Sequence, residues 1–368
     1  MKLTNWVWGI VVGLVLSANL PVMAIAPGIV KGRLDGNSAT LNDVSFFDVY
    51  SFEGEAGESV FIELNSEEFD AVLGLLDPEG NEIAQNDDGE EGKNAQIFIV
   101  LPTTGRYDII VAAFEKQFGS YRLSWRDASA IEVKQAKADE LLQQGNQQFR
   151  VSQFKEAIDS WEQSLKLYEE LGDREGEAAS LNNLGIAYFS LGEYQRSINL
   201  YQQSLKLARE IGDREGEAKS LSNLGIAYRN LGEYQRAIDF QQQSLAIKGE
   251  IGDRGGEANS YISLGNAYLS LGKYQRAINF YQQSLAIQQE IGNRGGEANS
   301  LLNLGLAYRN LGEYRKAIDF HQQSLKLARE IGDREGEANS LGNLGIAYFS
   351  LGEYQRSINL HQQSLAID

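Results

Sequence analysis

The stretch Leu181-Asn182-Asn183-Leu184-Gly185-Ile186-Ala187-Tyr188 recurs along this 368-residue chain at intervals of 40 residues. Close copies begin at Leu221, Tyr261, Leu301 and Leu341. The copies belong to units that start at residues 178, 218, 258, 298 and 338, and a degenerate sixth unit occupies residues 138–177. Self-similarity at such a period is the signature of stacked structural repeats, so residues 138–368 are predicted to form a solenoid.

Each unit has the pattern of two antiparallel helices. In the unit that starts at residue 178, apolar residues recur at three- and four-residue steps in two segments, 178–191 and 198–211. Gly192 and Gly212 follow these segments, where a left-handed residue commonly ends a helix. Asp213 is placed to cap the next helix. Because one hairpin cannot bury its apolar stripe alone, the sequence predicts that neighbouring hairpins stack.

The spacing of Leu181, Leu184, Gly185 and Tyr188, with an aromatic residue at Tyr201, resembles the tetratricopeptide repeat (TPR). The resemblance covers residues 138–368 and implies an all-α solenoid that binds other proteins. Two features depart from the family pattern. The period is 40 residues instead of about 34, and the proline that usually closes the second helix is absent.

The resemblance implies a concave binding face, built from side chains of the first helices that do not enter the core. A carboxamide can both donate and accept hydrogen bonds, so a ladder of Asn can hold an extended peptide backbone, and Arg can hold carboxylates. The expected peptide-binding residues are Asn183, Asn223, Asn303, Asn343, Asn259, Asn299, Asn339, Arg229 and Arg309. The alternative is that these Asn residues are only solvated side chains copied by duplication.

Residues 28–126 have a period of two, which is typical of strands. Segments 45–52 and 59–64 alternate between apolar and polar residues, and segments 71–76 and 96–101 have the composition of more deeply buried strands. Clusters of Gly, Pro, Asp and Asn separate the segments. Several short strands at this spacing predict an antiparallel, jelly-roll-like β-sandwich.

The same segment resembles the bacterial pre-peptidase C-terminal (PPC) domain. The motifs that carry the resemblance are Asp48-Val49-Tyr50-Ser51-Phe52-Glu53-Gly54, Phe69-Asp70-Ala71-Val72-Leu73, Asp77-Pro78-Glu79-Gly80, Asn86-Asp87-Asp88-Gly89 and Leu101-Pro102-Thr103-Thr104-Gly105-Arg106-Tyr107. The resemblance implies a secreted accessory or binding module, here at the N-terminal side of the repeats.

One loop of the β segment carries oxygen ligands of the kind that Ca²⁺ prefers. Asn86, Asp87 and Asp88 lie in it, and Asp70 and Asp77 are expected nearby. The spacing is not that of an EF-hand, and a solvated Asp-Gly turn fits the same residues. Structural calcium is the one cofactor that the sequence suggests.

The first 24 residues have the pattern of an export signal. Lys2 precedes an apolar run at residues 6–18, and Pro21 breaks it. This run is too short to span a bilayer, which takes about 20 residues, so cleavage is predicted after Ala24; an uncleaved anchor is the alternative. The predicted location is periplasmic or extracellular. Further along, Ser129 and Glu132 form a capping box, so residues 129–137 are predicted to be the start of a linker helix that leads into the array.

The composition excludes several classes of protein. There is no Cys, which excludes disulfides, Cys-ligated zinc and thiol nucleophiles. The 33 basic and 51 acidic residues give a net charge of −18, which disfavours binding to nucleic acid. The two His residues, His321 and His361, occupy a variable structural position of the second helices, so no catalytic residue is predicted.

The sequence therefore predicts an exported, non-enzymatic scaffold that binds a protein or peptide partner and has no membrane span after signal removal. Two alternatives remain open at this point. In the first, the chain is the targeting or regulatory N-terminal part of a longer CHAT-type peptidase. In the second, it is a self-assembling structural array.

Overall fold

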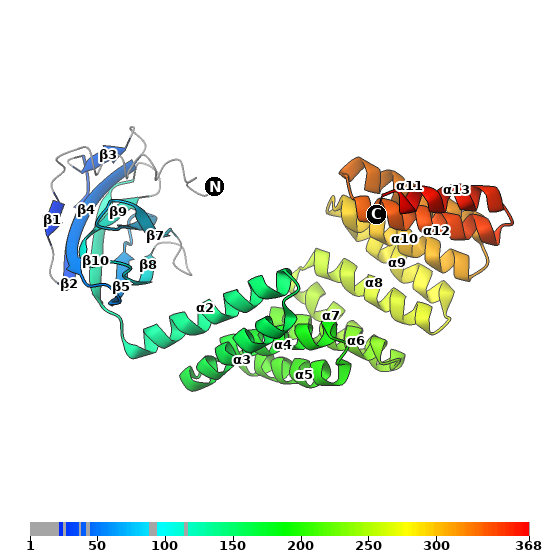
Figure 1. The fold of residues 1–368 in the computed structure, drawn as a ribbon, viewed down its shortest axis with the longest axis horizontal. Coiled ribbons are helices and arrows are strands. Elements are labelled where there is room, and N and C mark those ends of the chain that lie inside the picture. The colour runs from blue at the N-terminus through cyan, green and yellow to red at the C-terminus, as the bar shows by residue number, and fades with distance from the viewer. Residues whose placement is uncertain are drawn as a thin grey trace. The chain divides into compact units, whose positions relative to one another are not determined.

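The computed structural model describes residues 22–24, 27–36, 38–41, 45–87, 94–113 and 117–367 (Figure 1). The chain divides into two compact units, residues 1–137 and 138–368. Most of the predicted export signal lies outside the described residues. No helix in the described part of the chain is long and apolar enough to cross a membrane.

The N-terminal unit contains two sheets, as predicted. The first has the strand order β1 (Val22–Ala24), β4 (Ser45–Gly54), β9 (Gly105–Ala113), β6 (Ala71–Leu76) and β7 (Glu82–Asn86), and β3 (Ala39–Leu41) also pairs with β4. The second has the order β2 (Gly28–Leu34), β10 (Gly119–Asp127), β5 (Ser59–Asn65) and β8 (Ala95–Val100). The β1–β4 pair is parallel and the other pairs are antiparallel. Cleavage after Ala24 would remove β1.

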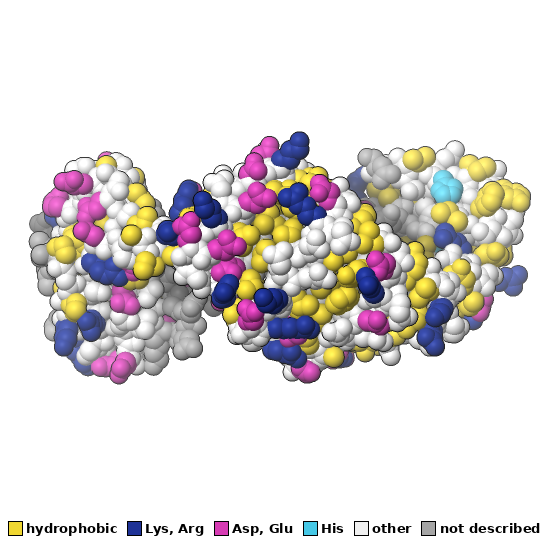
Figure 2. All heavy atoms as spheres, turned by 90° about the horizontal axis from the view of Figure 1, so that it is seen from below, with side chains coloured by type: hydrophobic (Ala, Val, Ile, Leu, Met, Phe, Trp, Pro, Cys, Tyr) yellow, Lys and Arg dark blue, Asp and Glu magenta, His cyan; other side chains and the backbone are white. Residues whose placement is uncertain are grey.

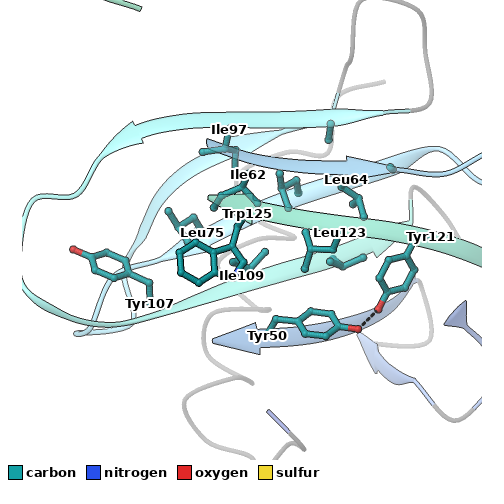
Figure 3. Close-up of a cluster of buried hydrophobic side chains, with 14 of the residues drawn as sticks. Tyr50, Ile62, Leu64, Leu75, Ile97, Tyr107, Ile109, Tyr121, Leu123 and Trp125 are labelled. Carbon is teal, nitrogen blue, oxygen red and sulfur yellow. Dashed lines mark hydrogen bonds between the residues drawn. The ribbon is translucent and has the colours of Figure 1, made fainter. Parts of the chain in front are cut away.

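The core of this unit lies between the two sheets (Figure 3). Strand β5 buries every second side chain, whereas all six residues of β6 are buried. The ring of Phe52 stacks on Trp125, with 4.3 Å between ring centroids, and also on Tyr107. Tyr50 and Tyr121 join the two sheets through a 2.7 Å hydrogen bond between their hydroxyls, and Tyr121 also donates to Asp48. Buried aromatic hydroxyls thus keep hydrogen-bond partners, as burial requires.

The second unit consists of helical hairpins, which confirms the predicted repeat. Their helices are α2 (Ala130–Arg150) and α3 (Phe154–Leu171), α4 (Arg174–Ser190) and α5 (Tyr194–Ile211), α6 (Arg214–Asn230) and α7 (Tyr234–Ile251), α8 (Arg254–Ser270) and α9 (Tyr274–Glu290), α10 (Arg294–Asn310) and α11 (Tyr314–Ile331), and α12 (Arg334–Ser350) and α13 (Tyr354–Leu365).

The helix ends follow the predicted chemistry. The carboxylate of Asp213 accepts a 2.8 Å hydrogen bond from the backbone N–H of Gly216 at the start of α6. Gly192 and Gly212 have φ values of 79° and 75°, in the left-handed region that only glycine adopts readily. These caps set the hairpin geometry at every unit.

Pairs of buried serine hydroxyls connect successive hairpins. Ser204 on α5 donates a 3.0 Å hydrogen bond to the carbonyl oxygen of Ala178, and its Oγ lies 3.1 Å from the Oγ of Ser220 on α6. The same Oγ–Oγ pairs recur at Ser164–Ser180, Ser284–Ser300 and Ser324–Ser340. Because an unpaired buried hydroxyl is costly, these pairs fix the register between neighbouring hairpins.

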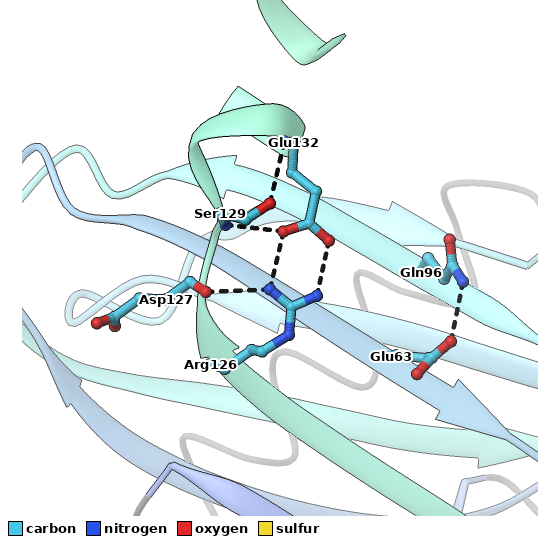
Figure 4. A network of polar contacts seen from close by, with 6 residues as sticks. All are labelled: Glu63, Gln96, Arg126, Asp127, Ser129 and Glu132. Carbon is cyan, nitrogen blue, oxygen red and sulfur yellow. Dashed lines mark hydrogen bonds and ion pairs between the residues drawn. The ribbon is translucent and has the colours of Figure 1, made fainter. Parts of the chain in front are cut away.

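The start of α2 is fixed by the predicted capping box and an ion pair (Figure 4). Ser129 N–H donates to Glu132 (2.8 Å), and the guanidinium of Arg126 binds the same carboxylate through two nitrogens. The hydrogen bond with Arg126 is the main reason that the pKa of Glu132 falls to about 2. The helix that begins here continues without a break to Arg150 and supplies the first helix of the first hairpin.

Candidate binding face of the helical repeats

The first helices of the hairpins form the inner side of the stack. Successive first helices (α4, α6, α8, α10 and α12) contact one another as well as their hairpin partners, whereas the second helices approach one another less closely. Side chains at matching positions of the first helices therefore form columns that run across the hairpins. This inner face is the candidate site.

The Asn column predicted from the sequence lies on this face, half-buried, but its amide groups bind within the chain. Asn183 Nδ2 donates to Asn146 Oδ1 (3.0 Å), and Asn223 Nδ2 donates to Asn182 Oδ1 (2.9 Å). In both cases the bond links two consecutive first helices. These side chains therefore stabilise the stack in addition to lying on the inner face.

Farther along the array, the amide donors form hydrogen bonds with acceptors of their own helix. Asn303 Nδ2 donates to the backbone oxygen and to Oδ1 of Asn299, and Asn343 Nδ2 donates to the backbone oxygen of Asn339. Asn259, Asn299 and Asn339 are exposed. The amide donors of Asn183, Asn223, Asn303 and Asn343 are thus engaged within the chain, and their role in peptide binding stays a prediction.

The sequence reasoning missed Asn182. Its side chain is 4% exposed, and its Nδ2 has no hydrogen-bond partner, although its Oδ1 accepts from Asn223. A buried donor without a partner carries a free-energy penalty that a ligand carbonyl can remove. The available signal was that Ser222, Ile262, Leu302 and Gly342 stand at the corresponding positions, so Asn182 is not a copied repeat residue.

Arg229 and Arg309 are half-buried on the inner face and form no ion pair within the described part of the chain. Arginines at the helix starts differ, because Arg254 and Arg294 each bind a Glu three residues on, at 2.7 and 3.1 Å. Figure 2 shows Lys and Arg side chains beside Asp and Glu on one face of the molecule. In the column of Arg229 and Arg309, every second residue is apolar: Phe189, Leu269 and Phe349.

His321 has no partner for catalysis. It is fully buried, and neither ring nitrogen has a hydrogen-bond partner. The corresponding Tyr281 donates to Asn266 and Gln241 donates to the backbone of Ser222, but the matching residues near His321 are Leu306 and Leu302. Burial, followed by the nearby charge of Arg309, lowers the pKa of His321 to about 4. The ring is thus a neutral core side chain at neutral pH.

The calcium prediction falls partly outside the described residues, because Asp88 is not among them. Asn86 ends β7 half-buried, with an Oδ1 that has no hydrogen-bond partner among the described residues, and Asp87 is also half-buried. Asp77 accepts hydrogen bonds from Asn81. The described residues contain no cluster of three or more His, Asp or Glu that could hold a metal. The calcium site stays a prediction, and a melting temperature unchanged by Ca²⁺ or EDTA would contradict it.

Hairpins that stack in register, with matching positions of their first helices aligned in columns, define the class of helical solenoid proteins. Residues 138–210, 187–250, 216–290 and 296–368 match the tetratricopeptide repeat family, and the chain belongs to that family. Residues 46–113 match the bacterial pre-peptidase C-terminal domain. A comparison with functionally curated proteins finds no match.

Solved structures with the same fold share little sequence with this chain. A STAND signal transduction ATPase with a tetratricopeptide repeat sensor, from Pyrococcus horikoshii, is 17% identical with a TM-score of 0.55, covering 63% of this chain and 37% of the other. Aspartyl phosphate phosphatase F from Bacillus subtilis is 14% identical with a TM-score of 0.52, covering 65% and 61%. A Rap protein complexed with Competence and Sporulation Factor is 16% identical with a TM-score of 0.51, covering 63% and 74%.

Proposed function

We propose that this chain is an exported, non-enzymatic scaffold whose inner helical face binds an extended peptide segment of a partner protein. Membership of the tetratricopeptide repeat family supports the scaffold role. The similarity of residues 46–113 to a bacterial domain of exported peptidases supports export. A Rap protein of the same fold is recorded in complex with Competence and Sporulation Factor, which supports a ligand of this kind.

The observation that carries the proposal is the unpartnered Nδ2 of Asn182 beside Asn223 on the inner face. A peptide backbone carbonyl is the acceptor that such a donor needs, and the buried Asn182 side chain must turn toward the inner face to meet it. The neighbouring oxygen of Asn183 is half-buried and can accept a peptide N–H. Together these carboxamides hold main chain without selecting a sequence.

Arg229 and Arg309 add a preference for acidic ligands. Both guanidinium groups are half-buried without an ion pair among the described residues, in a chain of net charge −18. A carboxylate is the usual partner of a guanidinium group, and two N–H donors can bind it at once. Because the two arginines stand two repeats apart with Leu269 between them, the preferred segment has acidic residues on both sides of an apolar one.

The test is a selection of displayed peptides on the full chain, followed by measurement of Kd for the selected sequences. We expect the selection to yield acidic–apolar–acidic sequences. The double variant Arg229→Gln/Arg309→Gln should bind these peptides at least tenfold more weakly. Arg315→Gln is the control. Arg315 is exposed on the second helix α11, so this substitution removes a positive charge away from the inner face. Equal loss in the control, or no loss in the double variant, contradicts the proposal.

Asn182→Ala tests the backbone contact separately. It removes the unpartnered donor and should weaken all selected peptides alike, whatever their charge. The circular dichroism spectrum and melting temperature of each variant show whether the array has stayed folded. Peptide binding that is unchanged in Asn182→Ala contradicts the role of this carboxamide.

A further inference from the structure

A groove of about 350 Å³ opens on the side of the stack formed by the second helices, between α11 and α13. Leu325 of α11, Leu341, Leu344 and Tyr348 of α12, and Leu360 of α13 form its apolar lining. Polar side chains, including Asn359, lie along the groove as well. It is separate from the inner face, which is built from the first helices.

Three other hairpins show which side chain fills this position. There, Phe240, Phe280 and Phe320 stand where the last hairpin has Leu360. Each Phe stacks on the tyrosine that corresponds to Tyr348, with ring centroids 5.3 Å apart and interplanar angles of 4°, 13° and 7°. Phe320 also packs with Leu285 against the same apolar cluster. In the last hairpin the shorter Leu360 cannot supply this aromatic ring.

The first of the near-identical hairpins also has a leucine, Leu200, but its tyrosine is covered differently. The guanidinium carbon of Arg196 lies 3.8 Å from the ring centroid of Tyr188, which is only 6% exposed. In the last hairpin, Arg356 lies 5.5 Å from the ring centroid of Tyr348, and Tyr348 is half-buried. Tyr348 therefore has neither a stacked Phe nor a close guanidinium group.

The charges at the groove favour a neutral occupant. Arg356 forms a 2.6 Å ion pair with Glu353, and Arg329 forms a 2.7 Å ion pair with Glu337. Both guanidinium groups at the groove are therefore already neutralised. An anionic ligand would have to compete with these glutamates, whereas an uncharged ring gains stacking and apolar contact without breaking them.

We propose that this groove receives a phenylalanine side chain of a partner polypeptide, which takes the place that Phe240, Phe280 and Phe320 occupy within the chain. Its ring stacks on Tyr348 and packs against Leu325 and Leu360. Asn359 Oδ1 already accepts a 3.3 Å hydrogen bond from Gln355, and its Nδ2 can donate to a carbonyl oxygen of the backbone that carries the ring. The site is thus a second contact for a partner, on the opposite side of the array from the peptide face.

The test measures binding of the probe N-acetyl-4-fluorophenylalanine amide to the full chain from the width of the ¹⁹F line of the probe. We expect wild-type protein to broaden the line in a saturable way, and N-acetylleucine amide to compete at least fivefold less well than N-acetylphenylalanine amide. Leu360→Phe should lower the affinity for the probe at least tenfold and raise the melting temperature, because it restores the stacked ring of the other hairpins.

Leu200→Phe is the matched control, since it makes the same change at the hairpin where Arg196 covers the tyrosine. It should leave probe binding unchanged. Tyr348→Leu provides a second arm if Leu360→Phe does not fold, and should remove the preference for the aromatic over the leucine competitor. Undiminished binding in Leu360→Phe, loss of binding in Leu200→Phe, or equal competition by leucine would each overturn the proposal.

Discussion

The imidazole of His321 covers Gly305 so closely that a Cβ atom at Gly305 would lie 2.4 Å from His321 Cε1. The same contact exists between Gly185 and Tyr201, at 2.5 Å, and between Gly265 and Tyr281, at 2.3 Å. In each hairpin, a large side chain of the second helix thus lies against the bare backbone of the first. The glycine of the repeat is required by this contact, since φ is not positive at these positions.

We expect Gly305→Ala to destabilise the array by about 1–3 kcal/mol, because the ring of His321 and its helix must move to admit the methyl group. Gly249→Ala is the control, since a Cβ at this position in the last turn of α7 meets no atom within 4 Å. The higher helix propensity of Ala should instead raise the free energy of unfolding by about 0.5–1 kcal/mol. Urea unfolding followed by circular dichroism measures both, and equal effects of the two substitutions would refute the contact.

His321 should make the array less stable as the pH falls. Its pKa is about 4 in the folded chain and near 6.5 when unfolded, so the unfolded state binds the extra proton first. The contribution of His321 to the free energy of unfolding should be constant above pH 7 and fall by up to about 3 kcal/mol between pH 6.5 and 4. Unfolding curves across this range measure the loss.

His321→Gln is the matched variant, because Gln241 occupies the corresponding position and donates to a backbone carbonyl. The difference in unfolding free energy between wild type and variant should grow as the pH falls from 6.5 to 4. Because both proteins contain His361 and the same carboxylates, the contributions of these groups cancel in the difference. A difference that does not depend on pH would show that His321 titrates normally.

Lys248 should be a destabilising residue. It is 8% exposed, where the equivalent residues of other hairpins are Ala208 and Ala328, and burial lowers the pKa of its ammonium group. Its Nζ donates to the Oγ of Ser260, which shows no Oγ–Oγ pair with Ser244. We expect Lys248→Ala to stabilise the array by about 1 kcal/mol at neutral pH.

The gain from Lys248→Ala should shrink as the pH approaches the ordinary lysine pKa of 10.5, where the unfolded state also loses its proton. Thermal melts at pH 7 and pH 10 measure this. Lys219→Ala, at an exposed position on α6, removes the same charge without burial and should change stability by less than about 0.5 kcal/mol. A loss of stability in Lys248→Ala would contradict the prediction.

The contact of Arg126 with Glu132 should stabilise the start of α2. In Glu132→Gln the capping hydrogen bond from Ser129 can persist while the ion pair is lost, so we expect a cost of about 0.5–1 kcal/mol, limited by solvent at the half-exposed Arg126. Because the folded pKa of Glu132 is about 2, this contribution is present above pH 4.5 and disappears as the pH falls toward 2. Hydrogen exchange of the first turn of α2 reports it, and unchanged protection would contradict the expected role.

Periodicity was sufficient to predict the hairpins, their caps and the two sheets. Helix-ending glycines such as Gly192 and capping residues such as Asp213 act locally, so their effect can be inferred from neighbouring residues alone. The repeat register places the start of the array at residue 138, where the chain also divides into two units, although α2 runs through this boundary without a break.

Contacts between hairpins decide which amide donors of the candidate site are already hydrogen-bonded. The sequence placed Asn183 and Asn223 on the inner face, but their donors find Asn146 and Asn182 on the preceding first helix. Residue-by-residue patterns do not report such bonds, which join residues about 40 positions apart. Asn182 and Leu360 were informative because they deviate from the repeat, whereas the prediction had relied on what the repeats share.

Each described interface with a Ser–Ser pair joins two hairpins through the same hydroxyl geometry, so one hairpin can follow any other without a new contact surface. Insertion or deletion of 40 residues in frame would therefore lengthen or shorten the inner face by one hairpin and leave the remaining hydroxyls paired. Recombination between near-identical repeats can thus change the length of the inner face in a single genetic event.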